Sequence, residues 1–459
     1  MKFETTPTNQ PAVKMSDLFA FIIAVIIVVI VIFFIFGPNT TAIIAILCGL
    51  FIIFLFAGLL SLLLRSSTHH YDENPGILTD DIAKVRKEGI PIPNSIAKSA
   101  IKNKTTKIRK FSTVTTETYP LTPQQIGSVY LGSVPYGGTG MNIGIITCYK
   151  YTNVQTDLNS YCSKFGLPLT TLQIHNFATQ IDSGWAVETV LDATMAHLYA
   201  PLATKHIFMS KDDSYASIAT ALQQAVGLKM NIITMSFGGD EEQDVINLLE
   251  PIFSANPNII FLAAAGDSDT VSYPSSSPNV ISVGGTILTV ASNNVNEKNG
   301  PTSTTVPITA NAYTKLAEEN WYSSDGNGSG HGVSSIFTTP PYQAAHNPST
   351  FRSTPDISLI AATPDDAGVL ICCSEYRVTP SNPAGPWIGV EGTSVSSPSL
   401  AGQITTANAA RIKVGKNSLT RTQILTYLYN LAPGSSAVDL MIDGCGNVSS
   451  KTIQALVSL

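Results

Sequence analysis

The stretch VEGTSVSSPSLAG, at residues 390–402, has the pattern of a strand that turns into a helix around a serine. Gly392 precedes a Thr-Ser pair, and Pro398 follows Ser394 by four residues. This pattern predicts that Ser394 is an exposed nucleophile at a strand-to-helix junction. Because a serine hydroxyl is a weak nucleophile until a positioned base takes its proton, the rest of the chain must supply that base.

The composition favours a large folded protein and argues against nucleic-acid binding. The chain has 459 residues, of which 44% are apolar, and this is enough for a sizeable core. Its 26 basic and 32 acidic residues give a net charge of −6. It shows no Lys- and Arg-rich face with interleaved aromatic residues. Its six cysteines lack the paired spacing of a zinc site. We therefore expect no nucleic-acid partner.

Two uncharged apolar runs near the start predict a transmembrane hairpin. They cover residues 18–36 and 42–64, and each reaches the roughly 20 residues that cross a bilayer. Lys2, Lys14 and Arg65 flank the outer ends, which by the positive-inside rule places both termini in the cytosol. Glycosylation triplets favour a lumenal domain instead. These triplets begin at Asn103, Asn327 and Asn447.

The pattern along the chain predicts four segments. Residues 1–17 form a tail, 18–64 two transmembrane helices, 65–118 a polar tether or short propiece, and 119–459 the catalytic domain. In the last segment, continuous Ile- and Val-rich runs alternate with amphipathic stretches. Such runs are typical of strands covered on both faces, so we expect a doubly wound α/β domain with a mostly parallel sheet.

Two groups of carboxylates are candidate partners of Ser394. Glu188 and Asp192 lie four positions apart in WAVETVLDATMAHLYAP, which places both on one face of an expected helix. Their neighbours are apolar, so we expect the pair to be partly buried and to share a proton or to shift its pKa values apart. Asp267 follows an apolar strand in FLAAAGDSD, where it is an Asx-turn residue or a second catalytic acid.

At these residues the chain resembles the sedolisin, or serine-carboxyl peptidase, family, whose fold is subtilisin-like. Seven fragments occur in the family's order from about Tyr119 to Asn447. They include the Glu-Asp helix, MSFGGDE, AAGDS, YPSSSPNVISVGGT, the block that begins at Trp321, RSTPDIS and GTSVSSP.

The resemblance implies a role for each candidate. Ser394 would be the nucleophile, Glu188 its general base, Asp192 the residue that orients Glu188, and Asp267 the donor to the oxyanion. A carboxyl group donates a hydrogen bond only while protonated, so the resemblance implies activity at acidic pH. We therefore favour an acidic lumen or the exterior over the cytosol.

Two residues resemble catalytic residues of the subtilisin type, and His197 is a further candidate base, but the sequence favours none of them. Asp182, in IDSG, and His331, in SGHGVSS, are similar to the subtilisin aspartate and histidine motifs. His331 has no following threonine, and we expect it in a loop. His197 lies in the apolar helix, where we expect a core histidine.

The resemblance also implies a calcium site, but the chain departs from the family there. Asp439 and Leu440 match the start of that site, whereas the glycine-rich second half is missing before the chain ends at Leu459. The polar stretch before Tyr119 is also much shorter than the family's prosegment.

These features favour a membrane-anchored serine peptidase that cleaves peptides or proteins through an acyl-enzyme. Two alternatives remain open at this stage. One is a Ser-His-Asp protease of the subtilisin type, and the other is a catalytically idle binding protein tethered to a membrane. Cleavage preference cannot be derived from the residues.

Overall fold

The computed structural model describes most of the chain beyond Pro120. The described residues are 103–104, 107–109, 120–130, 137–292, 313–322, 327–347, 349–364, 366–376, 386–431, 438–440, 446–448 and 452–459. The chain divides into two compact units, Met1–Ile90 and Pro91–Leu459, and every described residue belongs to the second. The expected hairpin at 18–64 lies outside the described residues. Among the described helices, none combines the length and apolar character that a membrane span requires.

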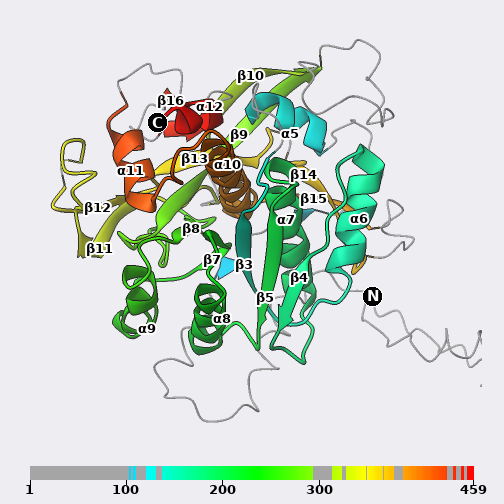
Figure 1. Ribbon diagram of the computed structural model, residues 1–459, viewed down its shortest axis with the longest axis horizontal. Helices are drawn as coiled ribbons and strands as arrows, with labels where there is room; N and C mark the ends of the chain where they lie inside the picture. Colours follow the sequence, from blue (N-terminus) through cyan, green and yellow to red (C-terminus); the bar gives the residue numbers. More distant parts are fainter. Residues whose placement is uncertain are drawn as a thin grey trace, which may run out of the picture. The chain divides into compact units, whose positions relative to one another are not determined.

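A large, mostly parallel sheet forms the centre of the domain (Figure 1). Its inner strands are parallel, whereas β16 runs antiparallel to β17, and β10 (Tyr313–Asn320) runs antiparallel to β9. The spatial order is β16 (Val438–Leu440), β17 (Gly446–Val448), β13 (Ile357–Ala362), β9 (Ile281–Ser292), β8 (Ile260–Ala264), β6 (Ile232–Met235), β3 (Asn142–Cys148), β5 (Thr204–Ser210) and β4 (Gln173–Asn176).

Alternating side chains of the inner strands fill two separate cores. On β3, Ile145 belongs to one apolar cluster and Ile146 to the other. On β8, Leu262 and Phe261 divide in the same way. Because both faces are buried, the strands are apolar throughout. The doubly wound parallel sheet predicted from the sequence is therefore confirmed.

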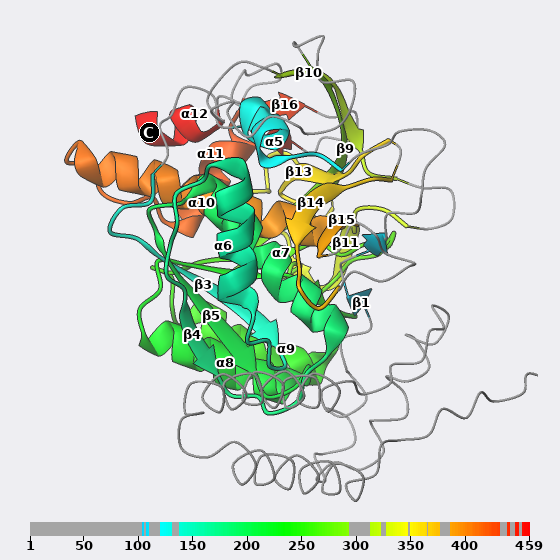
Figure 2. The same ribbon diagram turned by 90° about the vertical axis from the view of Figure 1, so that its right-hand side faces the viewer.

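Helices cover both faces of this sheet (Figures 1 and 2). α6 (Val154–Phe165), α7 (Ser183–Tyr199) and α10 (Thr393–Lys413) contribute to the first core. α8 (Tyr215–Gly227) and α9 (Gln243–Ser254) contribute to the second. The remaining described helices are α5 (Pro123–Tyr130), α11 (Arg421–Tyr429) and α12 (Thr452–Ser458).

Three small sheets complete the described fold. β11 (Gly332–Thr338) pairs with β12 (Phe351–Thr354). β15 (Trp387–Glu391) lies between β14 (Val369–Cys372) and β2 (Lys107–Arg109). β1 (Asn103–Lys104) pairs with β7 (Phe237–Gly238). Two strands from the segment interpreted as a tether or propiece thus pair with the catalytic domain.

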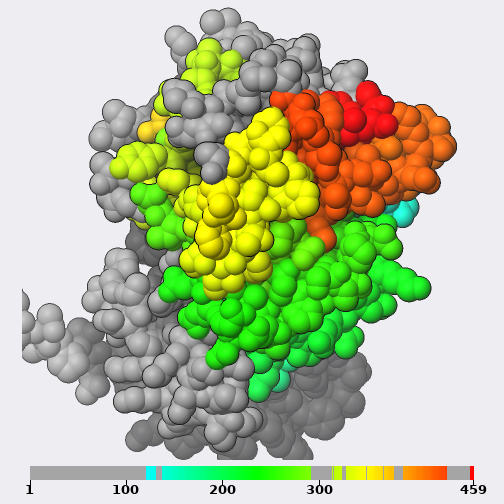
Figure 3. Space-filling model, turned by 90° about the vertical axis from the view of Figure 1, so that its left-hand side faces the viewer, coloured from blue at the N-terminus to red at the C-terminus, as the bar shows by residue number. Residues whose placement is uncertain are grey.

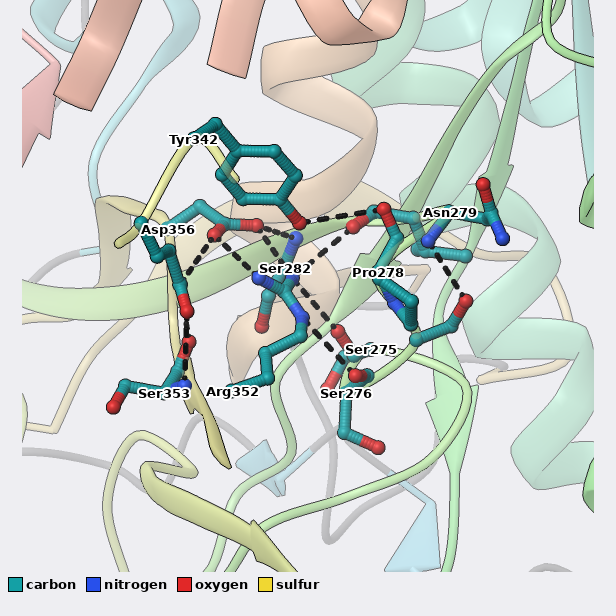
Figure 4. Close-up of polar contacts among 12 residues, drawn as sticks. Ser275, Ser276, Pro278, Asn279, Ser282, Tyr342, Arg352, Ser353 and Asp356 are labelled. Atoms are coloured by element: carbon teal, nitrogen blue, oxygen red, sulfur yellow. Dashed lines mark hydrogen bonds and ion pairs between the residues drawn. The ribbon is translucent and has the colours of Figure 1, made fainter. Parts of the chain in front are cut away.

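A buried ion pair connects the segment around β12 to the central sheet. Arg352 and Asp356 are both fully buried and form two bonds, of 2.8 and 2.9 Å. Arg352 also donates to the carbonyl oxygen of Ser276, and Asp356 accepts from the backbone of Ser282 and from the hydroxyl of Tyr429 (Figure 4). In Figure 3 the yellow segment with β11 and β12 lies beside the orange helices near the C-terminus. The pair thus joins three parts of the chain.

Candidate active site

Ser394 lies at the junction of β15 and α10, as the sequence predicts. It is the second residue of α10 and is fully buried, so the exposed position that the sequence predicted is wrong. Gly392, just before the helix, has a φ of 138°, a conformation that L side chains rarely adopt. The glycine therefore allows the sharp change of direction that brings Ser394 to the start of the helix.

α7, which carries Glu188 and Asp192, packs directly against α10, which carries Ser394. A methyl group at Gly402 would come within 2.8 Å of the carbonyl oxygen of Ala196, so the two backbones are in close contact there. Further along, Thr406 donates to the carbonyl oxygen of Tyr199 at 2.7 Å. The two contacts show that the helices run in the same direction.

Glu188 and Ser394 lie towards the N-terminal ends of these two packed helices. Gly402 lies eight residues after Ser394, and Ala196 lies eight residues after Glu188. Equal separations along two parallel helices correspond to equal rises along their axes. Glu188 is 3% exposed, and its carboxylate raises the pKa of Asp267, which accepts hydrogen bonds from Thr393 at the start of α10.

Asp192 lies one turn further along α7 and is fully buried. The hydroxyl of Ser236, just beyond β6, donates to Asp192 Oδ1 at 2.6 Å. Burial raises the pKa of Asp192 well above its usual value, and the nearby carboxylate of Glu188 raises it further, against the bond from Ser236. The two acids therefore interact strongly, as the sequence predicts.

Asp267 follows β8 and reaches the residue next to the nucleophile. Its Oδ1 accepts two hydrogen bonds of 2.8 Å from Thr393, one from the backbone N–H and one from the hydroxyl. Burial raises the pKa of Asp267 well above its usual value, the Thr393 bonds oppose that rise, and the carboxylates of Glu188 and Glu391 add to it. Since Oδ1 takes both Thr393 bonds, Oδ2 is the oxygen that can carry the proton.

The structure thus brings together all four residues that the sequence selected for catalysis. It adds Ser236, Thr393 and Glu391, which the sequence analysis did not select. Ser236 and Thr393 stand inside the quoted fragments MSFGGDE and GTSVSSP. Their bonds to carboxylates depend on contacts between residues far apart in the chain, so local spacing did not reveal them.

The subtilisin-type candidates have other roles here. Asp182 is the N-cap of α7 and accepts from the backbone N–H of Trp185 at 2.9 Å. His331 lies at the surface, 3.1 Å from Asp269 in an exposed ion pair. His197 is buried, its Nε2 lies 2.7 Å from the carbonyl oxygen of Pro168, and burial lowers its pKa to about 3. His331 and His197 thus have the loop and core positions that the sequence predicts, and the structure adds the capping role of Asp182.

Asp439 and Leu440, the expected start of a calcium site, belong to β16. Asp439 lies opposite Asn447 of β17 in an antiparallel pair. Within the part of the chain that the structure describes, no three His, Cys, Asp or Glu side chains are grouped closely enough to hold a metal. The calcium site therefore stays a prediction from the resemblance.

The fold and these residues can be compared with known proteins. A profile of the subtilase family matches residues 192–447, which is more than half of the chain. The chain belongs to the subtilase family. No curated protein sequence matches this subtilase.

Among solved structures, this subtilase is similar to Pseudomonas sedolisin, a serine-carboxyl proteinase, in a complex with two molecules of pseudo-iodotyrostatin. The TM-score is 0.58 at 21% identity, over 75% of this chain and 99% of that one. A lanthipeptide protease gives a TM-score of 0.43 at 13% identity, over 69% of this chain and 87% of that one. At such identities the similarity concerns the fold alone. Family membership makes the chain a subtilisin-like serine peptidase that acts on peptides or proteins.

Proposed function

We propose that this subtilase is a serine-carboxyl peptidase with Ser394 as nucleophile, Glu188 as base, Asp192 as the residue that orients Glu188, and Asp267 as oxyanion donor. The observation that supports the proposal is the electrostatic effect of the Glu188 carboxylate on Asp267, which accepts hydrogen bonds from Thr393 next to Ser394. His331, in the motif similar to the subtilisin histidine motif, contacts Asp269, and the core histidine His197 contacts Pro168.

Catalysis then proceeds by acyl transfer. Glu188 takes the proton of Ser394 as the hydroxyl oxygen bonds to the carbonyl carbon of the substrate. Protonated Asp267 donates a hydrogen bond to the oxyanion that develops. The peptide C–N bond breaks, and Glu188 returns its proton to the leaving amine. Water repeats the sequence on the acyl-enzyme and restores Ser394.

The two acids set opposite requirements for pH. Glu188 must be ionised to act as base, whereas Asp267 must keep its proton to act as donor. Burial favours the protonated form of Asp267, which supports a donor role for this residue. We therefore propose that the enzyme works in an acidic lumen or outside the cell, held to a membrane by the apolar runs at 18–36 and 42–64.

A peptidase assay on the full chain in membranes tests the assignment. Ser394→Ala and Glu188→Gln should each reduce turnover to near background, because each removes a member of one catalytic unit. Asp182→Asn and His331→Ala are the matched controls, and each should keep most of the activity. Full activity in Glu188→Gln, or loss of activity in His331→Ala alone, would contradict the proposal.

A further inference from the structure

Ser236 lies between the strands β6 and β7 and contacts one of the two acids on α7. It is 2% exposed, and its hydroxyl donates to Asp192 Oδ1 at 2.6 Å. A hydroxyl that donates to a carboxylate makes a short hydrogen bond, which is stronger than one between two neutral groups. The bond therefore fixes one of the two carboxyl oxygens of Asp192.

The other carboxyl oxygen of Asp192 is buried as well. Among the described residues, Asp192 Oδ2 has no hydrogen-bond partner. The carboxylate of Glu188, one helix turn earlier on α7, raises the pKa of Asp192. Two acids that interact in this way lose their protons in separate steps, so the pair holds one proton in the pH range between the steps. Because Ser236 takes Oδ1, Oδ2 is the Asp192 oxygen on which that proton can reside.

The central sheet determines the position of Ser236. β6 pairs with β3 on one side and with β8 on the other, and β8 leads to Asp267. β6 also contacts the helix that begins at the nucleophile, because the hydroxyls of Thr234, on β6, and Ser397, on α10, lie 2.9 Å apart. Ser236 thus connects an acid on α7 to the elements that carry Asp267 and Ser394.

Two described groups change the pKa of Asp192 in opposite directions. Burial raises this pKa, the carboxylate of Glu188 raises it further, and the hydrogen bond from Ser236 lowers it. Lys205, a cation on β5, which packs against α7, acts instead on His197 near the C-terminal end of the helix. Loss of the Ser236 hydroxyl should therefore make the acid pair release its first proton at a higher pH.

We propose that Ser236 is a positioning residue, which fixes Asp192 Oδ1 so that the proton shared by the two acids resides on Oδ2 and is donated in a hydrogen bond to ionised Glu188. This inference rests on the proposed function. In the acylation step the O–H bond of Ser394 breaks and an O–H bond forms on Glu188, while Asp192 keeps its own proton. Ser236 exchanges no proton, and it acts on Glu188 through Asp192.

The test measures kcat and KM of the full chain in membranes, with insulin B chain as the peptide substrate, from about pH 3 to about pH 8. Ser236→Ala should lower kcat about tenfold or more and leave KM within about twofold, because a small displacement of a catalytic base is costly. The acidic limb of kcat/KM should move up by about one pH unit, since a hydrogen bond to an ionised group is lost. The alkaline limb, which we assign to Asp267, should stay in place.

Ser399→Ala is the matched control. The hydroxyl of Ser399 is equally buried, but it donates to the carbonyl oxygen of Val395 at 2.6 Å instead of to a carboxylate. This variant should keep the kcat and the pH profile of the wild type. Ser236→Cys donates only weakly and should shift the acidic limb as Ser236→Ala does, whereas Ser236→Thr keeps the hydroxyl and should restore the limb. If Ser236→Ala does not fold, these two variants make the same comparison.

An acidic limb at the wild-type pH in Ser236→Ala or Ser236→Cys would overturn the inference. A loss of kcat in Ser399→Ala as large as that in Ser236→Ala would overturn it too, because any buried hydroxyl would then have the same effect. In both cases the proposed function stands if Ser394→Ala and Glu188→Gln are inactive. Full activity in Glu188→Gln would overturn the proposed function, and the inference with it.

Discussion

Replacing Asp267 by asparagine should remove the requirement of the enzyme for acidic pH. In the wild type, Asp267 Oδ1 accepts both bonds from Thr393, at 2.8 Å each, which leaves Oδ2 to carry the proton. In Asp267→Asn the amide oxygen can keep the Thr393 bonds while the NH₂ group takes the place of Oδ2. This donor does not titrate, so it remains available at every pH.

The size of the effect follows from the value of an oxyanion donor. Removing one donor costs about 10² to 10³ in kcat, or roughly 2.7 to 4 kcal/mol. Asp267→Ala should show this loss at all pH values. At acidic pH the kcat/KM of the wild type should equal that of Asp267→Asn. Above the raised pKa of Asp267, the kcat/KM of the wild type should fall about tenfold per pH unit, towards the value for Asp267→Ala.

The assay is kcat/KM for one peptide substrate from about pH 3 to about pH 8, with Ser394→Ala as the blank. The expected result is an alkaline decline in the wild type that is absent in Asp267→Asn. If the kcat/KM of Asp267→Asn declines at the same pH as that of the wild type, a group other than Asp267 causes the decline and the donor role of Asp267 is wrong. An Asp267→Ala enzyme within a few-fold of the wild type would lead to the same conclusion.

Three further predictions concern stability and topology. Burial raises the pKa of Asp192 in the folded state, so the folded protein loses stability relative to the unfolded chain as the pH rises above the pKa of Asp192 in the unfolded chain. Asp192→Asn removes this loss, so it should raise Tm near pH 7 and have little effect on Tm near pH 4. A lower Tm of the variant near pH 7 would contradict this. Arg352→Met leaves the buried carboxylate of Asp356 unpaired and should cost about 3 to 5 kcal/mol of unfolding free energy in denaturant titrations, whereas a loss below about 1 kcal/mol would show that the pair matters little. In the Ser394→Ala chain, tags at Met1 and Leu459 should both resist protease in sealed vesicles whose cytosolic face is outward, and digestion of both would place the domain in the cytosol.

The residues at the site could be selected from the sequence because each carries a local signal. Ser394 stands at a glycine-led junction, Glu188 and Asp192 share a helix face by their spacing, and Asp267 ends an apolar strand. Such signals depend on the chain within a few residues of each position, so they are visible without the fold. The resemblance to the sedolisin family then supplied the roles.

The sequence by itself determined the class of fold, because strands buried on both faces must be apolar throughout and helices between them must be amphipathic. Only the tertiary structure decided how these elements meet. The close contact at Gly402 packs α7 against α10, and Ser236 and Thr393 reach their carboxylates across 44 and 126 positions of sequence. The tertiary structure also decided that β1 and β2 pair with β7 and β15. A free strand edge exists only after the sheet has formed, and no local pattern in a short polar segment specifies which edge it will join.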